Sequence, residues 1–184
     1  MLEDLINIFN YSILLPIQEG FKVFIWSNEF YFTFIVISLL SIPIAFMRCY
    51  QVLNKDKTKS YSFFEIFVWL FRILQYSLIV FIGNDLQLGN LFSGNEWNNI
   101  FQDLNHINLQ QLIWDFVGYC IIFGIYNLGI HTVIREKWIT SVFKKVFNYE
   151  SNSATIRLAI ILGIKNLFLI PISVIYLLSI LTII

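Results

Sequence analysis

The sequence predicts an all-α integral membrane protein with four transmembrane helices and additional amphipathic helices at the membrane surface. The first observation is composition: 58% of the 184 residues are hydrophobic and only 13% are charged, whereas soluble domains carry about 25% charged residues. The mean hydropathy is accordingly +0.71. The second observation is a set of long apolar stretches, each close to the roughly 20 helical residues that cross a bilayer. The third is the uneven distribution of Lys and Arg between these stretches.

The N-terminal residues 1–27 do not have the pattern of a membrane-spanning helix. Apolar side chains recur there at helical spacing, opposite acidic and amide side chains. This pattern favours an amphipathic helix that lies in the membrane interface. We expect Pro16 and Gly20 to interrupt this helix, because both residue types disfavour a helix interior. The rest of the chain is expected to complete a single membrane domain covering 1–184.

The four predicted spans are joined by two basic connections and one acidic connection. The spans are expected at about 30–47, 62–83, 111–130 and 158–184. Connections 48–61 and 131–157 are rich in Lys and Arg, whereas 84–110 contains neither. Because basic residues in short loops stay on the inner side, both termini and the outer loop 84–110 are expected to face outward. The expected location is a bacterial cytoplasmic membrane or a mitochondrial inner membrane.

Two of the connections carry amphipathic patterns of their own. In the outer loop, Ser93 and Glu96 have capping-box spacing, and an apolar helical face comes after them. That face consists of Trp97, Ile100, Phe101, Leu104 and Ile107. A similar apolar face begins at Ile134 in the second basic connection. The basic residues that we expect to meet lipid headgroups or a partner protein are Lys55, Lys57, Lys59, Arg135, Lys137, Lys144 and Lys145.

Charged residues inside the spans are the candidate functional residues. Arg72 lies near the middle of the second span, about 15 Å from either end at 1.5 Å per residue. A guanidinium at that depth costs on the order of 3 kcal/mol unless a partner or water receives it. The second span must therefore face protein or water on one side.

Glu65 and Lys165 are further buried charges near the inner face, and Asp115 lies near the outer end of the third span. Glu65 precedes Arg72 by two helical turns, so we expect these two residues to form an ion pair, which Lys165 can join. One interpretation is a hydrated pathway in which the charges set ion preference or respond to voltage. The alternative is a structural ion pair that fixes helix packing.

The sequence contains none of the common catalytic or metal-binding motifs. HExxH, GxSxG and Walker A patterns are absent, and Cys49 and Cys120 do not have metal-ligand spacing. We therefore expect no enzymatic activity, no cofactor and no metal site. The formal net charge of +0 gives no reason to expect a nucleic-acid partner. The expected partners are the lipid bilayer and either further copies of this chain or the subunits of a membrane complex.

Part of the sequence resembles the PQ-loop transporters. Lys59 and Ser60, together with the aromatic segment 62–64, match the basic turn and aromatic-rich helix of that family. Pro43 and Gln51 are far apart here, whereas the family has them adjacent. This resemblance implies a small-solute transporter. In size and number of spans, the chain is also similar to the small four-helix membrane accessories of bacterial phage-defence systems.

These observations leave several functional hypotheses open. The first is an oligomeric membrane assembly, such as a pore, a channel or an effector or accessory in phage defence. The second is a structural subunit or adaptor of a larger membrane complex, respiratory or other. The third is a PQ-loop-like transporter, with uptake that depends on residues near Gln51 and Asn127. The fourth is an immunity protein that protects against a membrane-active toxin.

Overall fold

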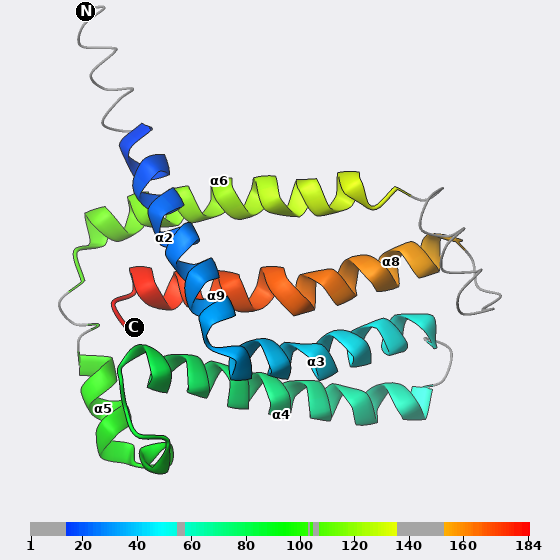
Figure 1. Cartoon of the computed structure of the whole chain (residues 1–184), viewed down its shortest axis with the longest axis horizontal. Coiled ribbons are helices and arrows are strands. Elements are labelled where there is room, and N and C mark those ends of the chain that lie inside the picture. Colours follow the sequence, from blue (N-terminus) through cyan, green and yellow to red (C-terminus); the bar gives the residue numbers. More distant parts are fainter. Residues whose placement is uncertain (1–13, 55–57, 103, 105–106, 136–152) are drawn as a thin grey trace, which may run out of the picture. The chain divides into compact units, whose positions relative to one another are not determined.

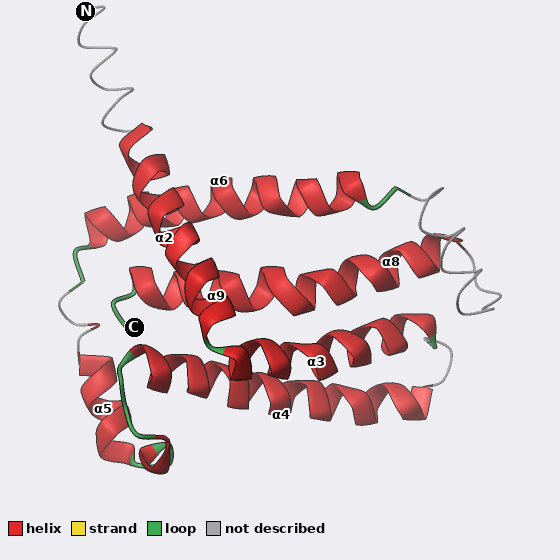
Figure 2. Cartoon of the chain, viewed as in Figure 1, coloured by secondary structure: helices red, strands yellow, loops and turns green. Residues whose placement is uncertain are grey.

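The computed structural model describes residues 14–54, 58–102, 104, 107–135 and 153–184 (Figure 1). Within these residues the chain forms helices and loops and no β-strand (Figure 2). In the described part of the chain, four helical segments are long and apolar enough to cross a membrane: Ile35–Leu53, Ser62–Gly83, Leu109–Val133 and Ser153–Ile180. The prediction of an all-α membrane protein with four spans is confirmed.

The first two described helices are α2 (Leu15–Thr33) and α3 (Ile35–Leu53). Pro16 lies in the first turn of α2, where its missing N–H has no helical partner to lose. Gly20 lies inside the helix and does not interrupt it, contrary to expectation. The chain turns at Phe34, so α3 begins after the start of the predicted span. It also continues beyond Arg48, whose charge is paired with a carboxylate of the neighbouring helix.

The middle of the chain contains one long helix on either side of a polar connection. The long helix α4 spans Thr58–Gly83 and precedes the short 3-10 helix η2 (Leu88–Asn90). The amphipathic helix α5 covers Gly94–Gln102, starting directly after Ser93 as the sequence predicts. The second long helix, α6, covers Leu109–Val133.

The last span is one helical run with a wider turn inside it. It comprises α8 (Ser153–Ile164), the π-helical segment η4 (Lys165–Leu169) and α9 (Ile170–Ile180). In η4 the N–H of Ile170 donates to the carbonyl of Lys165, five residues earlier. Pro171 comes immediately afterwards, and its ring crowds the preceding turn and removes one backbone donor. The proline gives a local reason for the π-helical turn.

The contacts divide the chain into two compact units. Unit 1 comprises Met1–Phe34, Tyr76–Ile125 and Ile172–Ile184. Unit 2 comprises Ile35–Gln75 and Tyr126–Pro171. Both α4 and α6 contribute residues to each unit, and so does the last helical run.

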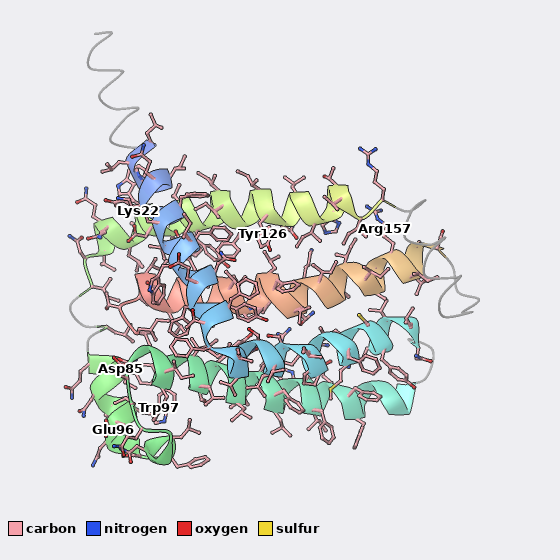
Figure 3. The ribbon with its side chains drawn as sticks, viewed as in Figure 1. Lys22, Asp85, Glu96, Trp97, Tyr126 and Arg157 are labelled. Carbon is pink, nitrogen blue, oxygen red and sulfur yellow. The ribbon has the colours of Figure 1, made fainter. Side chains whose placement is uncertain are left out.

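One core of unit 1 lies beneath α5. Ile100 of α5 is buried with Val80 and Ile183, and Trp97 and Leu104 pack against this cluster. The indole of Trp97 points toward the end of α4 and contacts the ring of Phe81, with centroids 5.2 Å apart (Figure 3). The predicted apolar face of α5 is thus confirmed at its centre.

Unit 1 also contains a close crossing of α2 over α6 (Figure 1). A Cβ atom built on Gly118 would lie 3.0 Å from the carbonyl oxygen of Pro16 and 3.6 Å from the Cα of Gly20. The two backbones therefore approach as only small residues allow. The phenol of Tyr176 enters the same crossing and is fully buried, and its hydroxyl is unpaired among the described residues.

Unit 2 is built from α3, the first part of α4, the second part of α6 and α8 with η4. Helix α3 packs against α8 and η4. A Cβ atom built on Gly163 would lie 2.5 Å from the Sγ of Cys49, so a larger residue fits here only if something shifts. A separate apolar cluster joins Ile130 and Ile134 to Ile161. Most of the surface helix predicted from Ile134 onward lies outside the described residues.

Candidate functional site

Several polar residues of unit 2 lie along one face of α4. Glu65, Val68, Arg72 and Gln75 are separated by three, four and three residues, so they share one side of a helix. This side is turned inward: Val68 is 0% exposed and Gln75 is 2% exposed. Ile73, the next residue after Arg72 and on the outer side, is 59% exposed. The expectation that this span packs its charged side inward therefore agrees with the structure.

Arg48 of α3 is the partner of Glu65. Its guanidinium forms two hydrogen bonds with the carboxylate, at 2.6 Å and 2.9 Å. Gln51 completes the cluster by accepting from Arg48 at 2.9 Å and donating to Glu65 at 3.2 Å. This paired geometry is the strong form of an Arg–carboxylate contact. The predicted Glu65–Arg72 ion pair is wrong, because the neighbouring helix supplies a cation with better geometry.

Arg72 instead bonds to a neutral side chain. One of its terminal nitrogens donates to Oδ1 of Asn166 at 2.5 Å. Asn166 lies in η4, is 4% exposed and donates in turn to the carbonyl of Leu162. A guanidinium has five N–H donors, and this is its one protein acceptor among the described residues. Among the described residues Arg72 thus has a positioning partner but no direct salt bridge, and the Glu65 carboxylate acts on it only at longer range.

Gln75 extends the polar face one turn further along α4. Its amide nitrogen donates to the hydroxyl of Ser41 at 2.6 Å and to the carbonyl of Ile37 at 2.9 Å. Both acceptors belong to α3, and Ser41 also donates to the carbonyl of Ile37 at 3.3 Å. These bonds join α3 to α4 within the span, where polar contacts between helices add modest stability.

Lys165 meets His131 and not Glu65. Its Nζ lies 2.9 Å from Nε2 of His131, at the end of α6. An ammonium only donates, so Nε2 of His131 is the acceptor in this pair. Arg157 of α8 donates to the backbone carbonyls of Ile134 and His131 at 2.9 Å and 3.1 Å (Figure 3). The bond to His131 occupies one of the last four carbonyl groups of α6, which have no helical partners of their own.

We call the series formed by Arg48, Gln51, Glu65, Arg72, Gln75 and Asn166 the polar stripe. Along α4 it extends ten residues, from Glu65 to Gln75, or about 15 Å at 1.5 Å per residue. That is about half the thickness of a hydrocarbon core. Its charge is unbalanced, because Arg48 and Arg72 face the single carboxylate of Glu65. Lys165, next to Asn166, adds a further cation to the same helical turn.

The remaining predicted residues lie elsewhere. Asp115 belongs to unit 1, where it lines a small pocket. Arg135 is exposed just after α6. The side chains of Lys55, Lys57, Lys59, Lys137, Lys144 and Lys145 lie outside the described part of the structure. Within that part, no three His, Cys, Asp or Glu side chains are placed to hold a metal ion.

The sequence alone does not identify several members of the polar stripe as candidate functional residues. Gln75 and Asn166 are uncharged, and Arg48 marks the end of a predicted span. A signal does exist: Ser41, Arg48 and Gln51 are spaced by seven and three residues, which places them on one side of α3. Polar residues at such spacing inside an apolar helix indicate a face that contacts other helices.

No family model, curated protein or solved structure matches this chain. The class of this protein is therefore assigned from its own architecture and polar stripe. It is an all-α membrane protein with four helices able to span a membrane.

Proposed function

We propose that this protein is a non-enzymatic subunit of an oligomeric membrane assembly that conducts ions, with the polar stripe forming the charge-selective part of the pathway. The stripe lies inside spanning helices, where uncompensated polar groups are costly and commonly mark ion pathways. Its members come from three different helical segments and are held by specific hydrogen bonds. The proposal rests most directly on Arg72.

The observation that carries the proposal is the unsatisfied hydrogen-bonding capacity of Arg72. Its one acceptor among the described residues is the amide oxygen of Asn166. The remaining N–H groups of a mid-span guanidinium require other acceptors, because each unsatisfied polar group in hydrocarbon costs several kcal/mol. Water in a pathway supplies such acceptors. Several copies of the chain would enclose that water better than one copy does.

The charge balance sets the direction of selectivity. Glu65 pairs directly with Arg48 and acts on Arg72 only at longer range, whereas Arg72 and Lys165 form no salt bridge among the described residues. Cationic side chains beside a pathway favour anions. We therefore expect the assembly to pass chloride more readily than potassium.

The test is an ion-flux measurement on purified protein in liposomes under a KCl gradient. The wild-type reversal potential is expected to be shifted from zero toward the equilibrium potential of chloride. Arg72→Leu should move it toward potassium, because the unneutralised charge is lost. Glu65→Gln should move it the other way, because Arg48 then loses its counter-ion.

Arg72→Lys serves as the charge-matched control and should keep most of the chloride preference. Particle size in detergent and the helical circular dichroism signal show whether each variant still folds and assembles. A wild-type protein that leaves the vesicles ion-tight contradicts the proposal. So does a conductance whose selectivity is the same in Arg72→Leu and Glu65→Gln.

A second candidate function is a subunit of a larger membrane complex. The same surplus charge favours it, because an acidic side chain from another membrane chain would satisfy Arg72 as well as water does. Purification in mild detergent separates the two functions. A stoichiometric second membrane protein that is lost in Arg72→Leu supports the complex, whereas a homo-oligomer with wild-type size supports the conducting assembly.

The similarity in size and span number to small membrane accessories of phage-defence systems supports a more specific role. We propose that the assembly acts in such a system as an effector or accessory. Phage plating on bacteria that express the protein with its neighbouring genes tests this role. Plating should be reduced by the wild type and restored by Arg72→Leu, and equal plating in all strains would contradict it.

A further inference from the structure

Unit 1 contains a pocket that the proposed conducting pathway does not use. Its volume is about 210 Å³, enough for several water molecules. It lies where α6 begins and the last helical run ends. Seven residues line it: Ile107, Asn108, Gln111, Leu112, Asp115, Ile180 and Thr182. Polar and apolar side chains are thus combined in one small cavity.

Asp115 gives the pocket its charge. Its carboxylate is partly buried and, among the described residues, accepts no hydrogen bond and meets no cation. Glu19 of α2 is close enough to repel it electrostatically. Lys22 is the single Lys or Arg of unit 1 within the described ranges. A partly buried carboxylate with an acidic neighbour and no cation is a site that attracts positive charge.

The other polar groups of the pocket provide acceptors around that charge. The amide of Gln111 and the hydroxyl of Thr182 are exposed and have no protein hydrogen bond within the described structure. Asn108 is different, because its Oδ1 already accepts from the backbone N–H groups of Gln110 and Gln111. The acceptors left for a ligand are therefore the Asp115 carboxylate, the side-chain amide oxygen of Gln111 and the Thr182 hydroxyl.

This set of acceptors fits an ammonium group better than a metal ion. An ammonium group donates three hydrogen bonds, which matches three acceptor groups. Hard metal cations such as Ca²⁺ take six to eight oxygen ligands, about twice as many groups as this pocket offers. Three aliphatic side chains, Ile107, Leu112 and Ile180, form the rest of the lining. They give a surface for the short hydrocarbon part of an amine.

We infer that this pocket binds a small protonated amine, with the ammonium group on Asp115 and the alkyl group against Ile107, Leu112 and Ile180. The site uses residues of unit 1 and none of the polar stripe. Its test is therefore independent of ion conduction.

The experiment measures binding of n-butylammonium to the full chain in nanodiscs of zwitterionic lipid by isothermal titration calorimetry. Lipid-only discs give the blank. n-Butanol is the neutral probe of similar shape, and potassium is the metal-cation probe. Butylammonium should bind, with at least about a tenfold preference over butanol, because a charged hydrogen bond is lost in the alcohol.

Three variants locate the site. Asp115→Asn keeps the side-chain shape and should weaken butylammonium binding about tenfold or more. Gln111→Trp places a large ring at the exposed rim and should block the pocket while Asp115 is retained. Glu19→Gln is the matched control, because this carboxylate neighbours the pocket without lining it. Its effect should be smaller than that of Asp115→Asn.

Three results would overturn the inference. One is butylammonium binding that is equal in the wild type and in Asp115→Asn. Another is butanol binding as tightly as butylammonium, which would show that charge plays no part. The last is potassium displacing the amine at lower concentration than the amine itself binds, which would make the pocket a metal-cation site.

Discussion

At the scale of single residues, three charged side chains of unit 2 each contact a group on another element. Glu65 reaches Arg48 on α3, Arg72 reaches Asn166 in η4, and Lys165 reaches His131 on α6. Such contacts between helices fix their rotation about their own axes, because a rotated helix would carry its charge into lipid. The hydrogen bonds of the stripe thereby support packing as well as the proposed pathway.

A single glycine tests the packing of α3 on α8. Gly163→Ala would bring its new methyl group 2.5 Å from the Sγ of Cys49, so either the thiol or the two helices must shift. We expect a loss of about 1–3 kcal/mol in unfolding free energy, as for other overpacked sites. Unfolding in mixed detergent micelles measures it.

Gly129→Ala on α6 is the matched control, because nothing lies within 4 Å of a Cβ atom built there. It should be neutral or slightly stabilising, since alanine favours the helix. Adding Cys49→Ala to Gly163→Ala should restore most of the loss. Equal effects of the two single glycine variants would contradict the close approach of α3 and α8.

The sequence predicts which residues are charged within the spans but not all of their partners. Helical spacing places Glu65 and Arg72 on one side of α4, and that much agrees with the structure. Spacing along one helix says nothing about which neighbouring helix supplies a closer cation. The sequence pattern places Arg48 in a loop, because a charged residue after an apolar run commonly ends a span. In the structure α3 continues to Leu53, and Arg48 lies inside it, paired with Glu65.

At the scale of elements, the π-helical turn η4 positions the partner of Arg72. A residue gained or lost in a helical turn rotates the rest of the helix by about 100°. Because Asn166 lies within η4, its direction depends on that turn. Pro171, directly after the first residue of α9, is the local cause we assign to it.

Pro171→Ala is expected to return residues 165–169 to α-helical hydrogen bonding. Asn166 would then turn away from Arg72, and the guanidinium would lose its one described protein acceptor. The ¹⁵N–¹H resonances of the Arg72 guanidinium, measured by NMR in nanodiscs, should shift. Pro43→Ala in α3 is the control, because α3 is α-helical through its proline. Unchanged Arg72 resonances in Pro171→Ala would contradict the role assigned to this turn.

The sequence predicts the number and type of the elements better than their ends. Apolar length indicates the four spans, and the spacing from Ser93 to Leu104 indicates α5. The turn at Phe34 has no such signal, because Tyr31, Phe32 and Ile35 are as apolar as the span itself. For the π-helical turn, Pro171 is the one signal in the sequence. A proline shows that a helix is perturbed without showing how.

At the scale of the whole molecule, the two units differ in charge. In unit 1 the described carboxylates are Glu19, Glu29, Asp85, Glu96 and Asp115, against Lys22 alone. In unit 2 the cations with described side chains are Arg48, Arg72, Arg135, Arg157 and Lys165, against Glu65 alone. The formal net charge of +0 does not reveal this separation, because the two units offset each other. The positive-inside rule uses the distribution of Lys and Arg along the sequence.

The predicted orientation is tested by cysteine labelling in intact cells. In a background with Cys49→Ala and Cys120→Ala, a cysteine at Gln87 should react with a membrane-impermeant maleimide added outside. A cysteine at Asn54, in the first basic connection, should react only after the membrane is opened. The reverse pattern would place the basic connections outside and contradict the predicted topology.

We expect Arg72 to face protein and water within the span and not lipid. A nitroxide spin label at position 72, compared with one at Ile73, tests it by power saturation in liposomes. Ile73 is 59% exposed and serves as the lipid-facing reference. We expect low oxygen accessibility and measurable contact with a water-soluble nickel complex at position 72, with the opposite at position 73. Equal and high oxygen accessibility at both positions would contradict it.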